Sequence, residues 1–172
     1  VAGYSHSSFE AAGRSSTASS NNYHLGLYGG AQWGNLGLRS GLAYSWHSVD
    51  SSRSVAAGGI TDSLSASYGA GTVQAFGEVG YTLEAAGYRV EPFASLAHAS
   101  LRTERFTETG NAAALSVDGD TTGLTFLTLG ARAETTLAFG VTDVRLNGMI
   151  GWRHAFGDVA PTSTHAFAGS DV

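Results

Sequence analysis

The chain has 172 residues, a net charge of −5, no cysteine and no lysine, and only 13% of its residues are charged. A disordered chain needs more charge and fewer aromatic residues than the 10% found here. Twenty-four glycines, with many serines and threonines, argue against a helical bundle. No run approaches the about 18 apolar residues of a transmembrane helix. The acidic balance offers no basic face for nucleic acid, and the lack of cysteine excludes disulfide frameworks and thiol catalysis. A soluble all-β protein and a transmembrane β-barrel remain.

Apolar and polar residues alternate with a period of two along most of the chain, which predicts β-strands. Most of these strands have ten or more residues, whereas strands of soluble proteins usually have about five or six. A strand that crosses a membrane needs about 9–11 residues, so the lengths favour the barrel. The seven predicted strands cover residues 1–9, 22–33, 36–49, 68–83, 88–101, 122–137 and 141–156.

The connections alternate between short and long. The short ones are the tight hairpin Trp33-Gly34-Asn35-Leu36, whose Gly-Asn pair allows positive φ, and the segments Glu84-Ala85-Ala86-Gly87 and Ala138-Phe139-Gly140. The long polar ones cover residues 10–21, 50–67 and 102–121, and a tail follows from Gly157. Outer-membrane barrels have short periplasmic turns and long extracellular loops. A soluble sandwich has no reason to place every long loop at one end.

Six of the seven predicted strands have an apolar and a polar face; the first, residues 1–9, is too mixed to assign. Leu38 and Leu42, for example, alternate with Arg39 and Gly41. In a barrel the apolar face meets lipid and the polar face lines the lumen, whereas in a sandwich the polar face would be the solvated surface. Arginine suits a lumen because its planar fork binds carboxylates and stays charged when partly desolvated. The charged residues predicted to line the lumen are Arg39, Glu78, Arg89, Glu91, Arg132, Glu134, Arg145 and Arg153.

Two pairs of these charged residues lie on adjoining strands. Glu78 and Glu91 form one pair, and Arg132 and Arg145 form the other, which predicts cross-strand ladders on the lumen face.

Aromatic residues of the apolar face lie near the strand ends, and the residues between them are Leu, Val, Ala, Ile and Gly. This distribution predicts a lipid-facing band with an aromatic girdle at each interface, because a sandwich core would have its aromatics in mid-strand. The predicted girdle beside the short turns has Trp33, Tyr81, Tyr88 and Phe139, and the girdle beside the long loops has Tyr23, Tyr44, Trp46 and Trp152.

Motifs for catalysis or metal binding are absent or weak. The sequence has no G-x-S-x-G, H-E-x-x-H, P-loop or G-x-G-x-x-G motif. His47 and Asp50, with nearby serines, lie where a predicted strand meets a loop; they are the weak candidate dyad of a barrel-embedded hydrolase, which we do not expect. Asp118-Gly119-Asp120 lacks the glutamate that completes a calcium loop, so we expect a turn there. We therefore expect no catalytic residue, metal or cofactor.

Several motifs follow one another at hairpin spacing: Tyr28-Gly29-Gly30; Leu42-Ala43-Tyr44 with His47 and Arg53; Phe76-Gly77-Glu78-Val79-Gly80-Tyr81; Glu91-Pro92-Phe93-Ala94-Ser95-Leu96; and Gly151-Trp152-Arg153-His154-Ala155-Phe156-Gly157-Asp158. In this order the sequence resembles the C-terminal β-barrel translocator domain of bacterial autotransporters, the type V secretion proteins. The similarity covers about residues 4–157.

The resemblance implies an antiparallel up-and-down barrel of twelve transmembrane strands, threaded by an N-terminal helix. On that pattern the seven strands look like strands three to nine, and residues 1–172 would be one partial translocator domain. The resemblance also implies a barrel that anchors the protein in the bacterial outer membrane and supports export of an N-terminal passenger.

The partners implied are outer-membrane lipid, the passenger segment in the lumen, the barrel-assembly machinery and, at the two open edges, strands of other chains. Some autotransporters cut their own passenger with lumen carboxylates, which makes Glu78, Glu91 and Glu134 candidates for that role. The alternative function is an outer-membrane porin or adhesin whose long loops bind an external partner.

Overall fold

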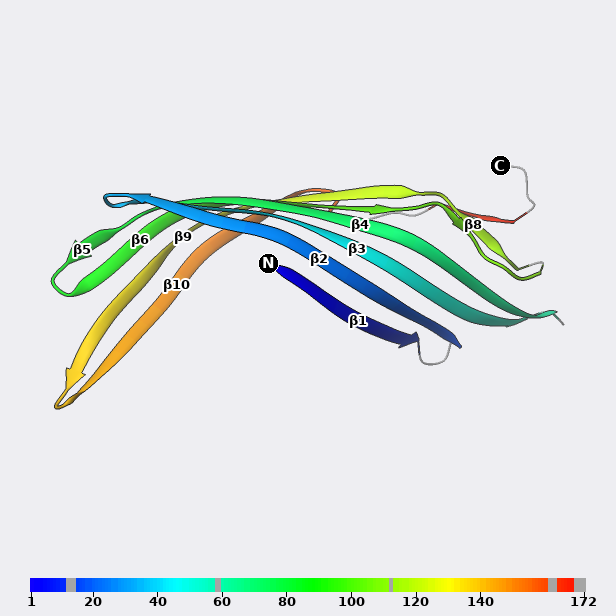
Figure 1. The fold of residues 1–172 in the computed structure, drawn as a ribbon, viewed down its shortest axis with the longest axis horizontal. Coiled ribbons are helices and arrows are strands. Elements are labelled where there is room, and N and C mark those ends of the chain that lie inside the picture. The colour runs from blue at the N-terminus through cyan, green and yellow to red at the C-terminus, as the bar shows by residue number, and fades with distance from the viewer. Residues whose placement is uncertain (12–14, 58–59, 112, 161–163, 169–172) are drawn as a thin grey trace.

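Seven long strands form one curved antiparallel sheet in the computed structural model, which describes residues 1–11, 15–57, 60–111, 113–160 and 164–168 (Figure 1). The strand order is β1-β2-β3-β4-β6-β9-β10, so each long strand pairs with the next one along the chain. The bounds are β1 (Ala2–Ala11), β2 (Ser16–Trp33), β3 (Leu36–Ala57), β4 (Ile60–Tyr81), β6 (Tyr88–Thr103), β9 (Asp120–Phe139) and β10 (Thr142–Gly157).

The remaining strands are short. β5 (Leu83–Ala85) extends the line of β4 and pairs with the start of β6. A separate three-stranded sheet has the order β11-β8-β7, from β7 (Phe106–Thr107), β8 (Leu115–Val117) and β11 (His165–Phe167). Within the described ranges no helix is long and apolar enough to cross a membrane. The up-and-down topology and the seven predicted strands are confirmed.

One end of the sheet has three two-residue turns. Their flanking pairs are Trp33↔Leu36, Ala85↔Tyr88 and Phe139↔Thr142. Gly34, Gly87 and Gly140 adopt φ values of 57°, 82° and 63°, which glycine tolerates because it has no Cβ. The prediction began the third turn two residues too early, at Ala138, because Ala138 and Phe139 still pair across the hairpin and the turn is Gly140-Val141.

At the other end the strands extend beyond their predicted limits, and two predicted loops are largely wrong. Most of residues 10–21 belong to β1 and β2, and most of residues 50–67 belong to β3 and β4. Pairs such as Ser52↔Ser65 continue the ladder with small polar residues on both strands. Most of these stretches have little apolar alternation, but on β4 the buried Leu64 and Ala66 alternate with exposed serines, a short pattern that the prediction missed. Residues 12–14 and 58–59 lie outside the described part.

The third predicted loop and the tail pack against each other. Residues 104–119 contain β7 and β8, and β8 pairs with β11 of the segment that follows β10. This connection also bonds to the edge of β4, since Ser65 and Thr109 exchange two backbone hydrogen bonds of 3.0 and 2.7 Å. We call residues 104–119 with β11 the cap.

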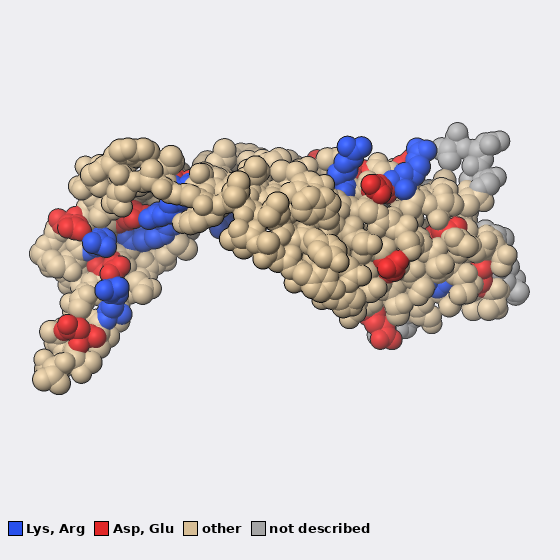
Figure 2. Space-filling model, in the orientation of Figure 1, with Lys and Arg blue, Asp and Glu red and all other residues tan. Residues whose placement is uncertain are grey.

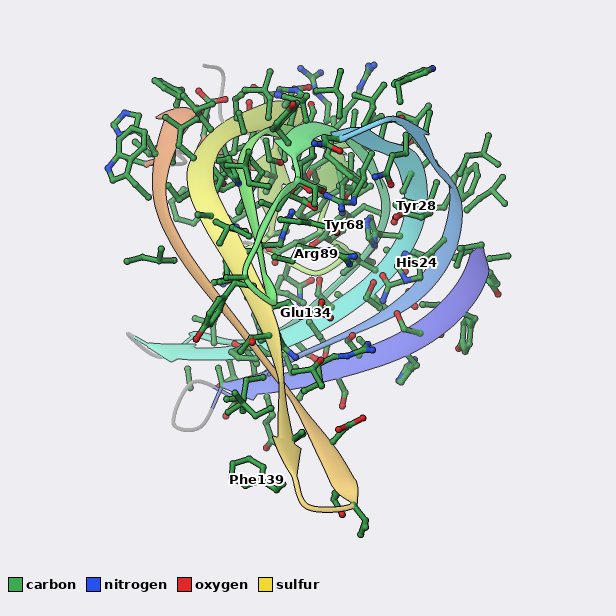
Figure 3. The ribbon with its side chains drawn as sticks, turned by 90° about the vertical axis from the view of Figure 1, so that its left-hand side faces the viewer. His24, Tyr28, Tyr68, Arg89, Glu134 and Phe139 are labelled. Carbon is green, nitrogen blue, oxygen red and sulfur yellow. The ribbon has the colours of Figure 1, made fainter. Side chains whose placement is uncertain are left out.

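The long sheet has two distinct faces because it curls. On β3 the odd-numbered residues from 37 to 55 are partly or fully buried, whereas the even-numbered ones are exposed. Figure 3 shows His24, Tyr28, Tyr68 and Arg89 on the inner side of the curl. We call this side the concave face and the other side the convex face.

The convex face is apolar and uncovered. Leu27 on β2 and Ile150 on β10 are 77% and 78% exposed. An exposed apolar surface of this size marks contact with a membrane or a partner rather than with water. On β2 the band runs over eleven residues, ten steps along the strand, from Tyr23 to Trp33. At about 3.4 Å per residue and a tilt of about 40° it spans about 26 Å, which matches the about 25 Å band of outer-membrane barrels.

Candidate functional site

Four charged side chains from four neighbouring strands meet on the concave face. Arg39 of β3 donates to Glu78 of β4 at 2.8 Å and to Glu91 of β6 at 2.8 and 3.3 Å. Arg132 of β9 donates to Glu91 at 2.9 Å and to Glu78 at 2.7 Å. Each carboxylate therefore binds both guanidinium groups, and the two positive and two negative charges compensate. We call these four residues the Arg–Glu cluster.

The register of the sheet and two glycines place the cluster. Arg39 pairs with Glu78, and Glu91 pairs with Arg132, so each pair lies on one face. A Cβ on Gly80 would come within 2.7 Å of the Glu91 carboxylate, so a side chain there would displace that carboxylate from its position between the two arginines. Gly130 likewise leaves room for a ring, because a Cβ there would lie 2.8 Å from Phe93.

Phe93 supports the cluster from below. The residue is 7% exposed, and the Arg132 guanidinium carbon lies 3.9 Å from the centroid of its ring, which is a cation–π contact. The side chains of Glu78 and Glu91 are only 12% and 15% exposed, whereas the two arginines keep more than a third of their surface open. The cluster is therefore held firmly where it rests on the sheet, and it is accessible from the interior of the curl.

The other four predicted lumen charges also lie on the concave face, outside the cluster. Arg89 pairs with Glu84 at 3.0 Å near the second short turn. Arg145 pairs with Glu134 at 3.3 Å. Arg153 donates to Thr128 at 3.2 Å, and its guanidinium carbon lies 5.9 Å from the Phe126 ring centroid. Figure 2 shows acidic and basic side chains gathered together near the short-turn end of the sheet.

One of the two predicted ladders is wrong. Glu78 and Glu91 do come together, but through the arginines of the cluster. Arg132 and Arg145 do not share a site, because Arg132 pairs in register with Met149, four residues from Arg145. Register, which the sequence pattern did not fix, decides which charges meet.

The predicted girdle residues lie on the convex face. At the long-loop side, Tyr23 pairs with Trp46, and the Trp46 ring centroid lies 4.5 Å from that of Tyr44. At the short-turn side, Trp33 and Tyr81 both pair with Leu36. Trp152 on β10 and Tyr88 on β6 are 55% and 57% exposed.

The sequence pattern missed Tyr4 on β1. It pairs in register with Tyr23, and the two ring centroids lie 5.2 Å apart, so it extends the girdle to the edge strand. The mixed composition of β1 hid its two faces. The spacing between β1 and β2 along the chain is the signal that could have identified Tyr4 as a girdle residue.

Two groups of hydrogen-bonded polar side chains cross the concave face near the level of Trp46. Neither group includes Asp50, so neither histidine forms a catalytic dyad with it. His47 bonds to Asn22 at 2.7 Å and to Thr72 at 2.8 Å. His24 bonds to Ser45 at 2.7 Å. Asp50 lies on the convex face, three residues from His47, and accepts a hydrogen bond from Ser67. The dyad that the sequence left open is therefore excluded by opposite faces.

A second ion pair, which the sequence pattern missed, fastens the cap to the sheet. Arg53 of β3 donates to both carboxylate oxygens of Glu108, at 2.7 and 2.6 Å, and to the Ala113 carbonyl oxygen at 3.0 Å. Glu108 also accepts a bond from the Leu115 backbone N–H at 2.9 Å. Chiefly because Arg53 donates to it, the pKa of the Glu108 carboxyl lies below its usual range.

Asp62 provides a second anchor for the cap. Its side chain is on the concave face of β4, and the residue is 3% exposed. It accepts backbone bonds from Asn111 at 3.0 Å and Ala113 at 3.2 Å, and a side-chain bond from Asn111. Leu64 is 1% exposed beneath the same segment, and the Tyr68 and Phe106 rings stack 4.2 Å apart. The cap therefore packs into the concave side of β4.

The described residues contain no group of three His, Asp or Glu side chains placed to hold a metal ion. The turn predicted at Asp118-Gly119-Asp120 is wrong, because Asp120 already begins β9, and Asp118 pairs with Arg105 within the cap at 2.6 Å. The concave face thus offers paired charges of both signs and hydroxyl, amide and imidazole groups.

Comparisons with known proteins agree with a sheet that has one apolar and one polar face. Residues 1–172 match the family model described as the autotransporter beta-domain. Two relatives from Serratia marcescens, each named an extracellular serine protease, are 40% and 39% identical over all 172 residues, which is 16% of the length of each.

A solved structure has the same fold. The translocator domain of autotransporter NalP from Neisseria meningitidis matches with a TM-score of 0.66 and 17% identity. The match covers 90% of this chain and 52% of that domain.

Proposed function

Since this chain belongs to the autotransporter beta-domain family, we propose that it forms part of an outer-membrane barrel that anchors a longer protein and supports export of its N-terminal passenger. The observation that carries this proposal is the pairing of an uncovered apolar convex face with a concave face of compensated charges. Lipid contacts the first kind of surface, and a translocating peptide can slide past the second.

The concave charges suit transport because they do not hold a passing chain tightly. In the Arg–Glu cluster every carboxylate already has two arginine partners, so a passing charge finds no unpaired opposite charge to trap it. The arginines remain more than one-third exposed and can exchange contacts with the peptide. We propose that all eight predicted lumen residues line the path of the passenger.

The convex girdles would hold the barrel at a fixed height in the membrane. Tyr23, Tyr44, Trp46 and Trp152 would lie at the outer interface, and Trp33, Tyr81 and Tyr88 at the periplasmic one. The two edge strands, β1 and β10, expose backbone groups that lipid cannot satisfy. We propose that further strands of the same barrel pair with these edges. We also propose that the barrel-assembly machinery inserts the complete barrel into the outer membrane.

The chain is proposed to have no catalytic role of its own. The relatives bear the name extracellular serine protease, yet the matched segment makes up 16% of their length. We assign any proteolysis of that kind to the part outside the segment. Self-cleavage by lumen carboxylates is tested by changing Glu78, Glu91 and Glu134 singly to Gln in the full-length protein. Unaltered passenger size in all three excludes it, and an uncleaved passenger in one of them identifies the residue.

Surface display in intact cells tests the proposed function. The full-length protein carries an epitope tag near its N-terminus, and antibody labelling reports arrival at the cell surface. Deletion of residues 1–172 is expected to leave the tagged part in the periplasm. Equal labelling with and without the segment would contradict the proposal.

A further inference from the structure

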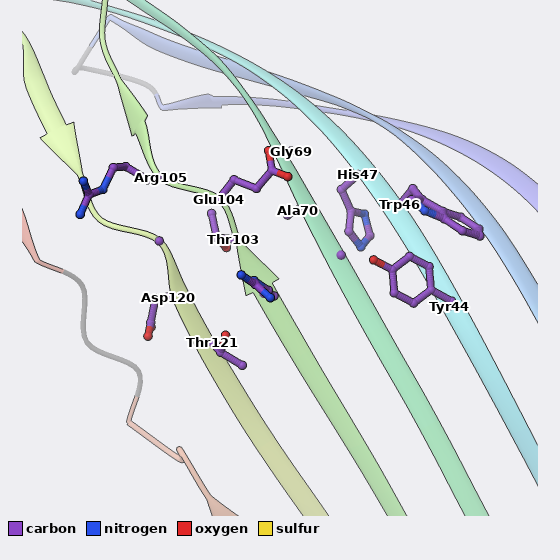
Figure 4. Close-up of a pocket in the computed structure, with 13 residues that line it drawn as sticks. Tyr44, Trp46, His47, Gly69, Ala70, Thr103, Glu104, Arg105, Asp120 and Thr121 are labelled. Carbon is purple, nitrogen blue, oxygen red and sulfur yellow. The ribbon is translucent and has the colours of Figure 1, made fainter.

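A hollow on the convex face lies just above the girdle at the long-loop side. Its volume is about 660 Å³, and it is lined by residues that include Tyr44, Trp46, Gly69, Gly71, Arg102 and Glu104 (Figure 4). Gly69 and Gly71 form its floor, so no side chain covers the backbone of β4 there. A Cβ on Gly71 would collide with the Tyr44 hydroxyl, which leans over this floor.

Arg102 is the polar group that distinguishes this hollow. It pairs in register with Gly71, which pairs with Trp46, so all three share the convex face. The other arginines on the described parts of the long strands, Arg39, Arg53, Arg89, Arg132, Arg145 and Arg153, all lie on the concave face by register. Arg102 makes no hydrogen bond or ion pair with any described residue, whereas neighbouring Arg105 is paired with Asp118.

An unpaired guanidinium beside an aromatic girdle suits a lipid headgroup. Tyr and Trp rings settle at the headgroup level of a membrane. A guanidinium presents parallel N–H donors that bind two phosphate oxygens at once. The Tyr44 hydroxyl offers another donor above Gly71.

Two carboxylates line the hollow and oppose an anion: Glu104, and Asp120 at the start of β9. A Cβ on Gly69 would lie 2.8 Å from the Glu104 carboxylate, so that carboxylate leans over the upper floor. Removing its charge should therefore strengthen anion binding, which gives the test a substitution with an effect of opposite sign.

We propose that this hollow binds the phosphorylated headgroup of a lipid in the outer leaflet, with Arg102 as the phosphate ligand. The inference rests on the proposed location in the outer membrane. The two can fail separately, because lipid binding is measured on purified protein and export is measured in cells.

The test is native mass spectrometry of the full-length protein in detergent, with diphosphorylated lipid A and with its dephosphorylated form as probes. The wild type should retain the phosphorylated form selectively. Arg102→Gln should lower the bound fraction about tenfold, since a charge-assisted bond to phosphate is lost. Glu104→Gln should raise it. Arg153→Gln, the same change on the concave face, should leave it unchanged.

A compact band in semi-native electrophoresis shows that each variant is folded. If Arg102→Gln fails to fold, Arg102→Lys replaces it. This variant should bind the phosphorylated lipid with intermediate strength, because it keeps the positive charge but loses the two parallel N–H donors of the guanidinium. Equal retention of both lipid forms, or unchanged retention when Arg102 is replaced, would overturn the proposal. Displacement of the lipid by millimolar inorganic phosphate alone would also overturn it, since the site would then bind the free ion.

Discussion

Arg53 and Glu108, 55 positions apart in the chain, form a two-point ion pair whose N···O distances are 2.7 and 2.6 Å. Their side chains are 29% and 11% exposed, so the pair is largely shielded from water. It ties the connection between β6 and β9 to the concave side of β3. The cap is thus attached through charges at a site where the sheet itself is made of small polar residues.

This pair makes the attachment of the cap sensitive to acid. The pKa of Glu108 is lower in the folded than in the unfolded state. Its contribution is therefore complete above the unfolded pKa of about 4.3 and is lost as the pH falls through the lower folded value. Hydrogen exchange of the β7 and β8 amides, corrected for intrinsic rates, should rise in that acidic range. Glu108→Gln should exchange faster at neutral pH and lose this pH dependence; a variant that kept it would show that another group titrates.

The four members of the Arg–Glu cluster should behave as one unit. Glu91→Gln is expected to lower the free energy of unfolding by about 2 kcal/mol, because both arginines then compete for Glu78. The double substitution of Glu91 and Arg132 by Gln should cost less than the sum of the single ones. Urea unfolding of the full-length barrel gives the three values. Simple additivity would show that the residues act independently.

Adjacent residues of β2 should differ in how much stability they lose when a charge is introduced. Leu27 lies in the middle of the convex band, and Tyr28 lies on the concave face near Phe76, with ring centroids 6.3 Å apart. In lipid vesicles Leu27→Arg should lower stability by about 2–4 kcal/mol, the cost of an arginine at the bilayer midplane. Tyr28→Arg should cost about 1 kcal/mol through the lost ring contact. A larger cost at Tyr28 would mean that the faces are assigned the wrong way round.

The second short turn contains a residue that the geometry does not favour. Ala86 has φ = 49°, in the left-handed region that alanine rarely adopts. Asn-Gly is the preferred pair for this turn, so Ala86→Asn before Gly87 should raise stability by about 0.5–1 kcal/mol. Ala85→Asn, one residue earlier in β5, serves as the control and should give no gain. The unfolding midpoint in urea distinguishes the two.

Strand faces and short turns could be predicted from the sequence because each leaves a local pattern. Leu38 and Arg39 alternate visibly, and Gly34-Asn35 marks its own turn. The far ends of β3 and β4 were missed because serines lie on both faces of β3 there, and because Asp62 interrupts the alternation of apolar residues with serines on β4. The cap has no sequence pattern either, because Arg53 and Glu108 meet through the path of the whole connection.

The composition of the charged cluster was also predictable, but its connections were not. Alternation placed Arg39, Glu78, Glu91 and Arg132 on one face. Which charges meet depends on register and on curvature, which brings β3 within reach of β6 across β4. Phe93 beneath Arg132 depends in turn on the absence of a side chain at Gly130.

The central claim is that this sheet separates lipid from a polar interior, and accessibility along β3 tests it most directly. Single cysteines at residues 37–46 of the full-length protein, in a cysteine-free background, carry nitroxide labels in lipid vesicles. We predict that collisions with oxygen peak at even positions such as Leu38 and Leu42, and that collisions with a soluble nickel chelate peak at odd positions such as Arg39 and Gly41. Equal accessibility at neighbouring positions, or the reverse alternation, would contradict the account.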